Sequence, residues 1–310
     1  MKAETNLQRI LAQGEFAVTC EFSPPRGIDV GLMRENAVQL KGRVDAVNVG
    51  DNSTASVRMS SWALSKILFD MGIEPVLQMV TRDRNRIALQ SDLLGASAFG
   101  IQNVLCLTGD HPSVGDHPQA KKVFDIDSVQ WIAAVKQIRD EGRLINGKKI
   151  SGDPGFFIGA VANPFVESLE LHIIRLEKKI AAGAQFIQTQ PVLDMVRFKE
   201  WLSRATEEGL TDRCAIIAGI VPLKSVAMAE YLRRDVPGIM IPNSIIARMK
   251  AVPEDQQLEA GMKICVEKIE ELKETKGVTG VHIMAIGCEE RLSEIIAQAG
   301  LLPRPSRSLT

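Results

Sequence analysis

The sequence predicts an α/β protein with the (β/α)8 TIM-barrel fold, in one domain over residues 1–310, with extra helices before the last strand. Apolar runs rich in β-branched residues recur about eight times, and amphipathic segments separate them. This alternation indicates a parallel sheet with helices outside it. Eight such units in 310 residues fit a closed barrel better than an open doubly wound sheet. No linker or low-complexity segment divides the chain.

The predicted strands are short, and several end in a polar residue. They cover residues 16–22, 44–50, 74–80, 103–109, 156–163, 186–192, 215–221 and 281–287. The first of them stops shortly before Pro24 and Pro25, which cannot continue a hydrogen-bonded ladder. Glu21 is therefore expected at the carboxyl end of its strand, which is the end where (β/α)8 barrels place their active sites.

Helices are predicted between the strands, where apolar residues fall three or four positions apart. Each of the four clearest segments ends at a glycine, which favours a helix C-cap: 54–72, 83–100, 127–142 and 166–183. The gap at 222–280 is longer than one crossover needs. Extra helices are expected there, at 224–235, 242–252 and 254–277.

Composition and charge exclude several classes of protein. The 37 basic and 38 acidic residues give a formal net charge of −1, which argues against a nucleic-acid or anionic membrane partner. No apolar stretch approaches the length of a membrane span, and the N-terminal residues carry charges where a signal peptide is apolar. The 5 cysteines are scattered without a C-x-x-C pair and are expected to be reduced. We therefore expect a soluble cytoplasmic protein.

Polar residues follow most of the predicted strands at the same end of the barrel; only the eighth strand is slow to offer one. They are Glu21, Asn48, Asp51, Asn52, Gln78, Thr81, Asp110, Asn163 and Gln190. In a mouth shielded from water, Glu21 and Asp110 could differ in pKa and act as a proton donor and an ionised stabiliser. Two plainer interpretations stay open: Glu21 as a solvated strand-end acid, and Asp110 as the cap of a turn.

A basic cluster on one predicted helix is a candidate anion site. Arg175, Lys178 and Lys179 are three and four residues apart and lie on neighbouring helix faces, although a solvated helix surface explains the same pattern. Gly109 would let the backbone approach a bound ring or phosphate closely. The histidines of residues 111–117 lack a standard zinc spacing. The sequence has no P-loop, Rossmann glycine motif or G-x-S-x-G motif.

Five motifs in order, CEFSPPRG, VNVGDNSTA, LTGDHP, AVANP and GAQFIQTQPVLD, resemble the 5,10-methylenetetrahydrofolate reductase family. The match runs from about residue 15 to residue 300 and is closest in kind to the short bacterial and acetogen forms. The resemblance implies a flavin at the carboxyl face of the barrel, usually FAD, with FMN as the alternative. It also implies a reaction in which a reductant loads the flavin and methylenetetrahydrofolate unloads it.

The resemblance also implies roles for individual residues. Glu21 matches a glutamate that donates a proton to the folate, and Asp110 matches an aspartate beside the flavin, so both are implied catalytic residues. Glu21 and Gln190 are the implied substrate-binding residues, because Gln190 matches a glutamine that hydrogen-bonds the pterin. The implied flavin contacts are Asn48, Gln78, Thr108, Gly109, Asp110, Ala162, Asn163, Arg175, Lys178 and Lys179.

Departures from the family pattern leave the electron donor open. Gln78 stands where many members have histidine, and residues 191–193 replace an aromatic run. The donor is NADH, NADPH or a partner protein, in a homo-oligomer or a hetero-complex. Two alternative functions also remain: a pterin-binding barrel that transfers a methyl group without flavin, and a flavin-binding electron-relay subunit of a larger complex.

Overall fold

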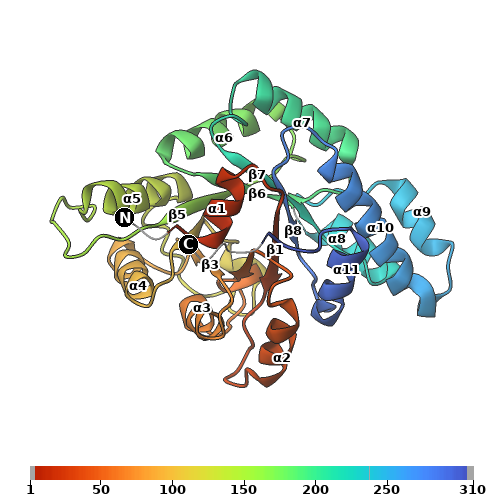
Figure 1. Cartoon of the computed structure of the whole chain (residues 1–310), viewed down its shortest axis with the longest axis horizontal. Coiled ribbons are helices and arrows are strands. Elements are labelled where there is room, and N and C mark those ends of the chain that lie inside the picture. The colour runs from red at the N-terminus through yellow and green to blue at the C-terminus, as the bar shows by residue number, and fades with distance from the viewer. Residues whose placement is uncertain (1–3, 237, 306–310) are drawn as a thin grey trace.

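The computed structural model describes residues 4–236 and 238–305, and its eight parallel strands close into a barrel in chain order (Figure 1). The predicted (β/α)8 fold is confirmed. The strands are Ala17–Phe22 (β1), Ala46–Val49 (β2), Pro75–Val80 (β3), Asn103–Leu107 (β4), Phe157–Ala162 (β5), Phe186–Pro191 (β6), Ala215–Ile220 (β7) and Gly280–Ile283 (β8). Strand β1 pairs with both β2 and β8, and so closes the sheet.

Helices surround the barrel, as Figure 1 shows. Those that follow the strands are Gly31–Leu40 (α2), Ser61–Asp70 (α3), Arg86–Ala98 (α4), Ser128–Glu141 (α5), Leu169–Ala182 (α6), Met195–Glu207 (α7) and Leu292–Gln298 (α11). The extra helices predicted before the last strand are confirmed as Val226–Asp235 (α8), Asn243–Lys250 (α9) and Gln257–Lys273 (α10).

Side-chain caps mark where several of these helices begin. Asn85 accepts hydrogen bonds from two backbone N–H groups of α4, and Asp194 does the same for α7. Asp127 forms a capping box with Gln130 at the start of α5. These caps satisfy backbone donors that a helix leaves unpaired at its first turn. They also fix where each loop at the carboxyl ends of the strands stops.

The short N-terminal helix Asn6–Ala12 (α1) closes the amino end of the barrel. In Figure 1 it crosses the centre of the ring of strands. Leu7 and Ile10 are fully buried and pack in one cluster with inward-facing residues of the strands. These residues are Ala17, Ala46, Val76, Leu105, Phe157, Phe186 and Ile217. The amino half of the barrel interior is therefore apolar.

Gly159 on β5 makes room for this apolar layer. A Cβ atom at Gly159 would lie 2.2 Å from Cζ of Phe186, whose ring stacks on Phe157 with centroids 5.0 Å apart. Any larger residue at this position would collide with the ring. The two aromatic rings thus fill the amino half of the barrel interior.

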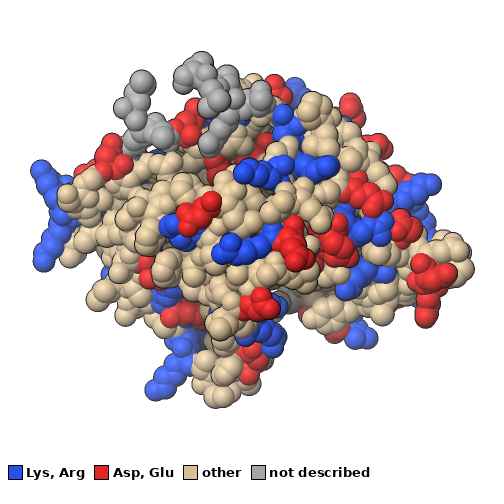
Figure 2. All heavy atoms as spheres, turned by 60° about the horizontal axis from the view of Figure 1, so that its bottom comes forward, with Lys and Arg blue, Asp and Glu red and all other residues tan. Residues whose placement is uncertain are grey.

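Charged side chains are spread over the surface. Figure 2 shows acidic and basic groups interspersed across the face in view, as the near-zero net charge leads one to expect. Within the described ranges, the structure contains no helix with the length and apolar character needed to cross a membrane.

Candidate active site

The carboxyl half of the barrel interior is lined by polar side chains. Successive residues of a strand point to opposite faces, so alternate residues face inward. The register of the sheet places Glu21 of β1 beside Asn48 of β2, and Thr19 of β1 beside His282 of β8. The inward-facing polar side chains are Thr19, Glu21, Asn48, Gln78, Gln188 and His282.

Glu21 lies at the top of this polar layer. Its Oε2 accepts a hydrogen bond of 2.7 Å from Nε2 of Gln78, and Nε2 of His282 lies 3.6 Å from the same oxygen. The side chain is 24% exposed, whereas that of His282 is 4% exposed. Glu21 therefore stands at the boundary between the barrel interior and its mouth. One carboxyl oxygen is held by neighbours and the other is left to contact a ligand.

A buried hydrogen-bonded network lies below Glu21. Oγ1 of Thr19 is 3.0 Å from Nδ1 of His282, and the Gln188 amide nitrogen donates to Thr19 at 3.3 Å. Asn48 and Gln188 exchange two hydrogen bonds, of 2.6 and 3.1 Å. Buried polar groups need such partners, and a network with all members satisfied is rigid. The network holds the floor of the mouth in one arrangement.

A cavity of about 170 Å³ opens between β5, β6 and α6. It brings together five of the predicted site residues: Ala162, Asn163, Arg175, Lys179 and Gln190. His172 also lines it and was not predicted. Two cations, two amides and a histidine on one small cavity suit an anionic group of a ligand.

The pKa of Lys179 is strongly shifted by its surroundings in this cavity. Its Nζ donates to the carbonyl oxygen of Val161 at 2.6 Å. Burial, and then repulsion by Arg175, lower the pKa of Lys179 to about 8. Burial also lowers the pKa of His172, with further contributions from Arg175 and Lys179. Mutual repulsion among these groups means that a bound anion would stabilise the charged form of Lys179.

Lys178 does not join this cavity. Its side chain is exposed on α6, while Arg175 and Lys179, four residues apart, share the face that lines the cavity. A β-bulge nearby sets the position of Gln190. Four residues of β6, Gln188 to Pro191, lie opposite three residues of β7, and Oγ1 of Thr189 accepts a hydrogen bond of 2.9 Å from a backbone N–H of β7. Such bulges redirect side chains beside active sites.

The loop after β4 holds Thr108, Gly109 and Asp110 at the rim of the mouth. Thr108 and Asp110 are exposed, and the buried guanidinium of Arg82 donates to the carbonyl oxygen of Asp110 at 3.1 Å. Gly109 has a φ of +87°, and a Cβ there would lie 3.0 Å from Cβ of Val80. Glycine is thus required by the loop conformation itself.

Asp51 does not line the mouth of the barrel and has a structural role. Its buried carboxylate accepts hydrogen bonds from the backbone N–H of Val80 at 2.8 Å and from Arg84 at 2.6 Å. These contacts tie the end of β2 to β3. Within residues 4–236 and 238–305, no group of three or more His, Cys, Asp or Glu side chains could hold a metal ion.

The sequence interpretation missed Gln188, His282 and Arg82. The eighth strand was predicted over residues 281–287, but β8 ends at Ile283, and the following residues form turns. The polar residue that β8 contributes is therefore His282, inside the predicted range. Gln188 could have been found by counting back two residues from Gln190, because inward positions alternate along a strand. No sequence pattern pointed to Arg82, because its role depends on contacts between loops.

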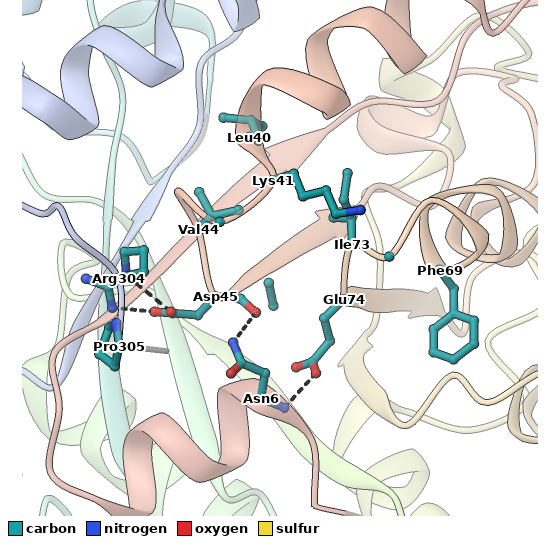
Figure 3. A pocket seen from close by; sticks show the side chains of 13 residues that line it. Asn6, Leu40, Lys41, Val44, Asp45, Phe69, Ile73, Glu74, Arg304 and Pro305 are labelled. Atoms are coloured by element: carbon teal, nitrogen blue, oxygen red, sulfur yellow. Dashed lines mark hydrogen bonds and ion pairs between the residues drawn. The ribbon is translucent and has the colours of Figure 1, made fainter. Parts of the chain in front are cut away.

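A larger cavity, of about 620 Å³, lies at the amino end of the barrel (Figure 3). Several of its polar groups are bound to one another: Arg304 to Asp45 at 2.6 Å, and the backbone N–H of Asn6 to Glu74 at 2.6 Å. The amino face of a (β/α)8 barrel contributes stability, whereas the carboxyl face carries catalysis. We therefore place the functional site at the opposite, smaller cavity and the polar mouth.

The fold and site define a (β/α)8-barrel protein with a polar mouth at the carboxyl ends of its strands. The family model described as methylenetetrahydrofolate reductase matches residues 6–300. The chain belongs to the methylenetetrahydrofolate reductase family, as its motifs led us to expect.

Relatives of two lengths match the chain. A Caenorhabditis elegans protein named "Probable methylenetetrahydrofolate reductase (NADPH)" is 25% identical over 95% of this chain, which spans 44% of that protein. The chain thus covers less than half of this relative, and also only 38% of one from Saccharomyces cerevisiae. A Pectobacterium carotovorum protein named "5,10-methylenetetrahydrofolate reductase" is 23% identical, with 95% of this chain and 94% of that protein covered.

The fold also matches a solved structure from Clostridium thermocellum, an uncharacterized protein that binds two copies of 5-methyl-5,6,7,8-tetrahydrofolic acid. The TM-score is 0.61 at 17% identity, and the match covers 96% of this chain and 98% of the other. At this identity the likeness shows the fold.

Proposed function

We propose that this protein reduces 5,10-methylenetetrahydrofolate to 5-methyltetrahydrofolate with a bound flavin, FAD or alternatively FMN. The observation that carries the proposal is the Glu21 carboxyl, held at the mouth of the barrel by Gln78 with one oxygen free. Family membership supports the reaction, as do the names of relatives that match the chain over nearly their whole length. The C. thermocellum neighbour, which binds the product of this reaction, supports the folate class of ligand.

The cavity at α6 fits the phosphates of a flavin nucleotide. Arg175 and Lys179 are the cations, and Asn163 and Gln190 add amide groups at its rim. Lys179 uses one of its three donors on the carbonyl oxygen of Val161, so two remain for phosphate oxygens. Asn48, Thr108, Gly109 and Ala162 stay proposed flavin contacts. When bound in reduced form, the flavin would supply hydride to the folate.

Glu21 is the proposed general acid. Opening the methylene bridge requires a proton on the folate nitrogen as its bond to the bridging carbon breaks, which leaves an iminium cation on the folate. A carboxyl group that is partly shielded and fixed by a neighbour is suited to this transfer. Asp110 lies at the rim, where its negative charge would favour the cation, and Gln190 is the proposed pterin partner.

The proposal also includes the electron donor, the assembly of the chain and its location in the cell. The electron donor is a nicotinamide nucleotide or an electron-donating protein, and the chain works as a homo-oligomer or in a hetero-complex. We keep residues 1–310 as one proposed domain. The five cysteines, which are all buried free thiols, are typical of a reducing compartment, so we propose the cytoplasm.

An anaerobic spectral titration tests the function. The purified protein is reconstituted with FAD, NADH is added, and methylenetetrahydrofolate follows. We expect the flavin absorbance to bleach with reductant and to return with folate. If neither NADH nor NADPH has an effect but dithionite-reduced flavin is reoxidised by folate, a protein donor is indicated. Folate that never reoxidises the flavin would favour an electron-relay subunit, and failure to bind any flavin would favour methyl transfer without redox chemistry.

A further inference from the structure

We propose that His282 is a positioning residue for Glu21. Its Nε2–H and the amide of Gln78 both donate toward Oε2, so that the proton which Glu21 transfers resides on Oε1. The kinetic consequence rests on the proposed function, whereas the hydrogen-bonding arrangement rests on the contacts of His282.

The other ring nitrogen of His282 faces two donors. Oγ1 of Thr19 lies 3.0 Å from Nδ1, and Nε2 of Gln188 lies 3.4 Å from it. The hydroxyl proton of Thr19 has one other acceptor within reach, the carbonyl oxygen of Val281 at 3.4 Å, and the ring nitrogen is the closer one. Nδ1 therefore accepts, and a neutral imidazole with an accepting Nδ1 carries its proton on Nε2.

Asn48 fixes the amide orientation on which this assignment depends. Its Nδ2 donates to Oε1 of Gln188 at 2.6 Å, and Nε2 of Gln188 donates back at 3.1 Å. The oxygen of Gln188 is thereby turned away from Thr19, and its nitrogen is turned toward Thr19 and His282. These four residues are at most 3% exposed, so bulk water does not compete for the same contacts.

Two donors consequently converge on one oxygen of Glu21. Gln78 lies 2.7 Å from Oε2, within hydrogen-bond distance, and His282 lies 3.6 Å from it. The second contact is longer than a hydrogen bond here, and such catalytic contacts tighten when the substrate is bound. Within the described part of the chain, Oε1 has no hydrogen-bond partner. A protonated carboxyl that accepts on Oε2 carries its proton on Oε1. As the O–H bond at Oε1 breaks, the N–H bond on folate forms, and the two donors stabilise the carboxylate that remains.

Nitrogen-15 NMR tests the arrangement without any folate chemistry. The chain has only 4 histidines, so labelling histidine gives few signals, and loss of one signal in His282→Gln assigns it. We expect His282 as the neutral Nε2–H tautomer at pH 8. An Nδ1–H tautomer, or a doubly protonated ring at that pH, would overturn the proposal whether or not the protein reduces folate.

Two substitutions of His282 distinguish the role of Nε2 from that of Nδ1. The amide nitrogen of glutamine can reach the place of Nε2 and keep a donor toward Glu21, whereas asparagine reaches only the place of Nδ1. With flavin reduced by dithionite, His282→Asn should slow reoxidation by saturating methylenetetrahydrofolate by about 10- to 100-fold. His282→Gln should stay within about threefold of the native rate, and folate affinity should change little in either. Equal rates in both variants would contradict the positioning role.

A double variant distinguishes positioning from a general structural role. In a Glu21→Gln background, His282→Asn should cause no further loss, because the group it positions is gone. A further loss of the same size would overturn the proposal. His117→Asn is the matched control, since His117 is 57% exposed on a loop, and its rate should equal that of the native protein. If folate fails to reoxidise the native flavin, the proposed function fails, and the NMR result still decides the arrangement.

Discussion

Gln78 donates a hydrogen bond of 2.7 Å to Oε2 of Glu21 from β3, a strand that does not pair with β1. The contact therefore crosses the interior of the barrel, above Asn48 of the strand between them. Because Gln78 is 7% exposed and its backbone is part of the sheet, its amide has little freedom to move. The position of the Glu21 carboxyl is set by the barrel and not by a loop.

Removal of the Glu21 carboxyl should affect one half-reaction only. Glu21→Gln keeps the size of the side chain but has no acidic proton, so the rate of flavin reoxidation by methylenetetrahydrofolate should fall by about 10²- to 10⁴-fold. The rate of flavin reduction should stay within about twofold, because that half-reaction needs no proton on folate. Stopped-flow absorbance of each half-reaction measures both rates. An undiminished folate rate would refute the assignment of Glu21.

Substitution of Gln78 tests whether its hydrogen bond to the Glu21 carboxyl contributes to the rate of the folate half-reaction. Gln78→Met has a similar volume and no donor, so the carboxyl loses its fixed position and the folate half-reaction should slow by about 10- to 100-fold. Gln78→His, the residue that many family members have, keeps an N–H group and should retain most of the rate. If the methionine variant matches the native rate, the hydrogen bond has no catalytic consequence.

The sequence predicted the parts of the site that lie at strand ends. Two prolines mark the end of β1, and this placed Glu21 correctly at the carboxyl face. Gln188 and His282 lie one or more residues inside their strands, where a polar residue in an apolar run gives no sign of which face it occupies. The contact between His282 and Glu21 depends on closure of the barrel between β8 and β1, which no local pattern encodes.

The basic helix shows a second limit of sequence interpretation. Spacing placed Arg175, Lys178 and Lys179 on neighbouring faces but could not say which face meets the barrel. That choice depends on how α6 packs, with Ile173, Leu176 and Ile180 buried. Packing turns Lys179 toward β5 and leaves Lys178 exposed.

Flavin affinity should depend on pH through Lys179. In the free protein its pKa is lowered to about 8, and a bound phosphate raises it, so binding takes up a proton above this pH. The affinity for FAD should then fall by up to about tenfold per pH unit above pH 8. The other groups that act on Lys179 are Arg175, Asp127 and Cys106. Burial raises the pKa of the Cys106 thiol, so it stays neutral in this range.

Two variants check this pH dependence by fluorescence titration of FAD between pH 7 and pH 9.5. Lys179→Arg keeps its charge throughout, so its affinity should be nearly independent of pH. Lys178→Ala should keep the pH dependence and lose less affinity than Lys179→Ala. An affinity that is flat with pH in the native protein, or an equal loss in both alanine variants, would contradict the placement of Lys179 on the flavin phosphates.

The ion pair at the amino end of the barrel should contribute to stability. Arg304 and Asp45 are 9% and 1% exposed and lie 2.6 Å apart, and Arg304 also donates to the carbonyl oxygen of Phe16. Arg304→Met leaves a buried carboxylate without this partner and should lower the free energy of unfolding by about 3–5 kcal/mol. Arg234→Ala, which removes an exposed pair with Asp235, should cost less than about 1 kcal/mol. Urea denaturation measures both, and similar losses would contradict the buried pair's role.

Gly159 should be a poorly replaceable glycine of the barrel wall. A Cβ there would lie 2.2 Å from Cζ and 2.4 Å from Cε2 of Phe186, a ring that is fully buried and has no space to retreat. Gly159→Ala should therefore lower the free energy of unfolding by about 1–3 kcal/mol through overpacking. Gly95→Ala is the control, because no atom lies within 4 Å of its would-be Cβ in helix α4, and it should stabilise by about 0.5–1 kcal/mol.

The double variant Gly159→Ala with Phe186→Leu tests the cause of this loss. If the collision with the ring is responsible, the smaller leucine relieves it, and the double variant should be more stable than the sum of the two single losses predicts. Strictly additive losses would mean that Gly159 is needed for its backbone and not for the space beside Phe186.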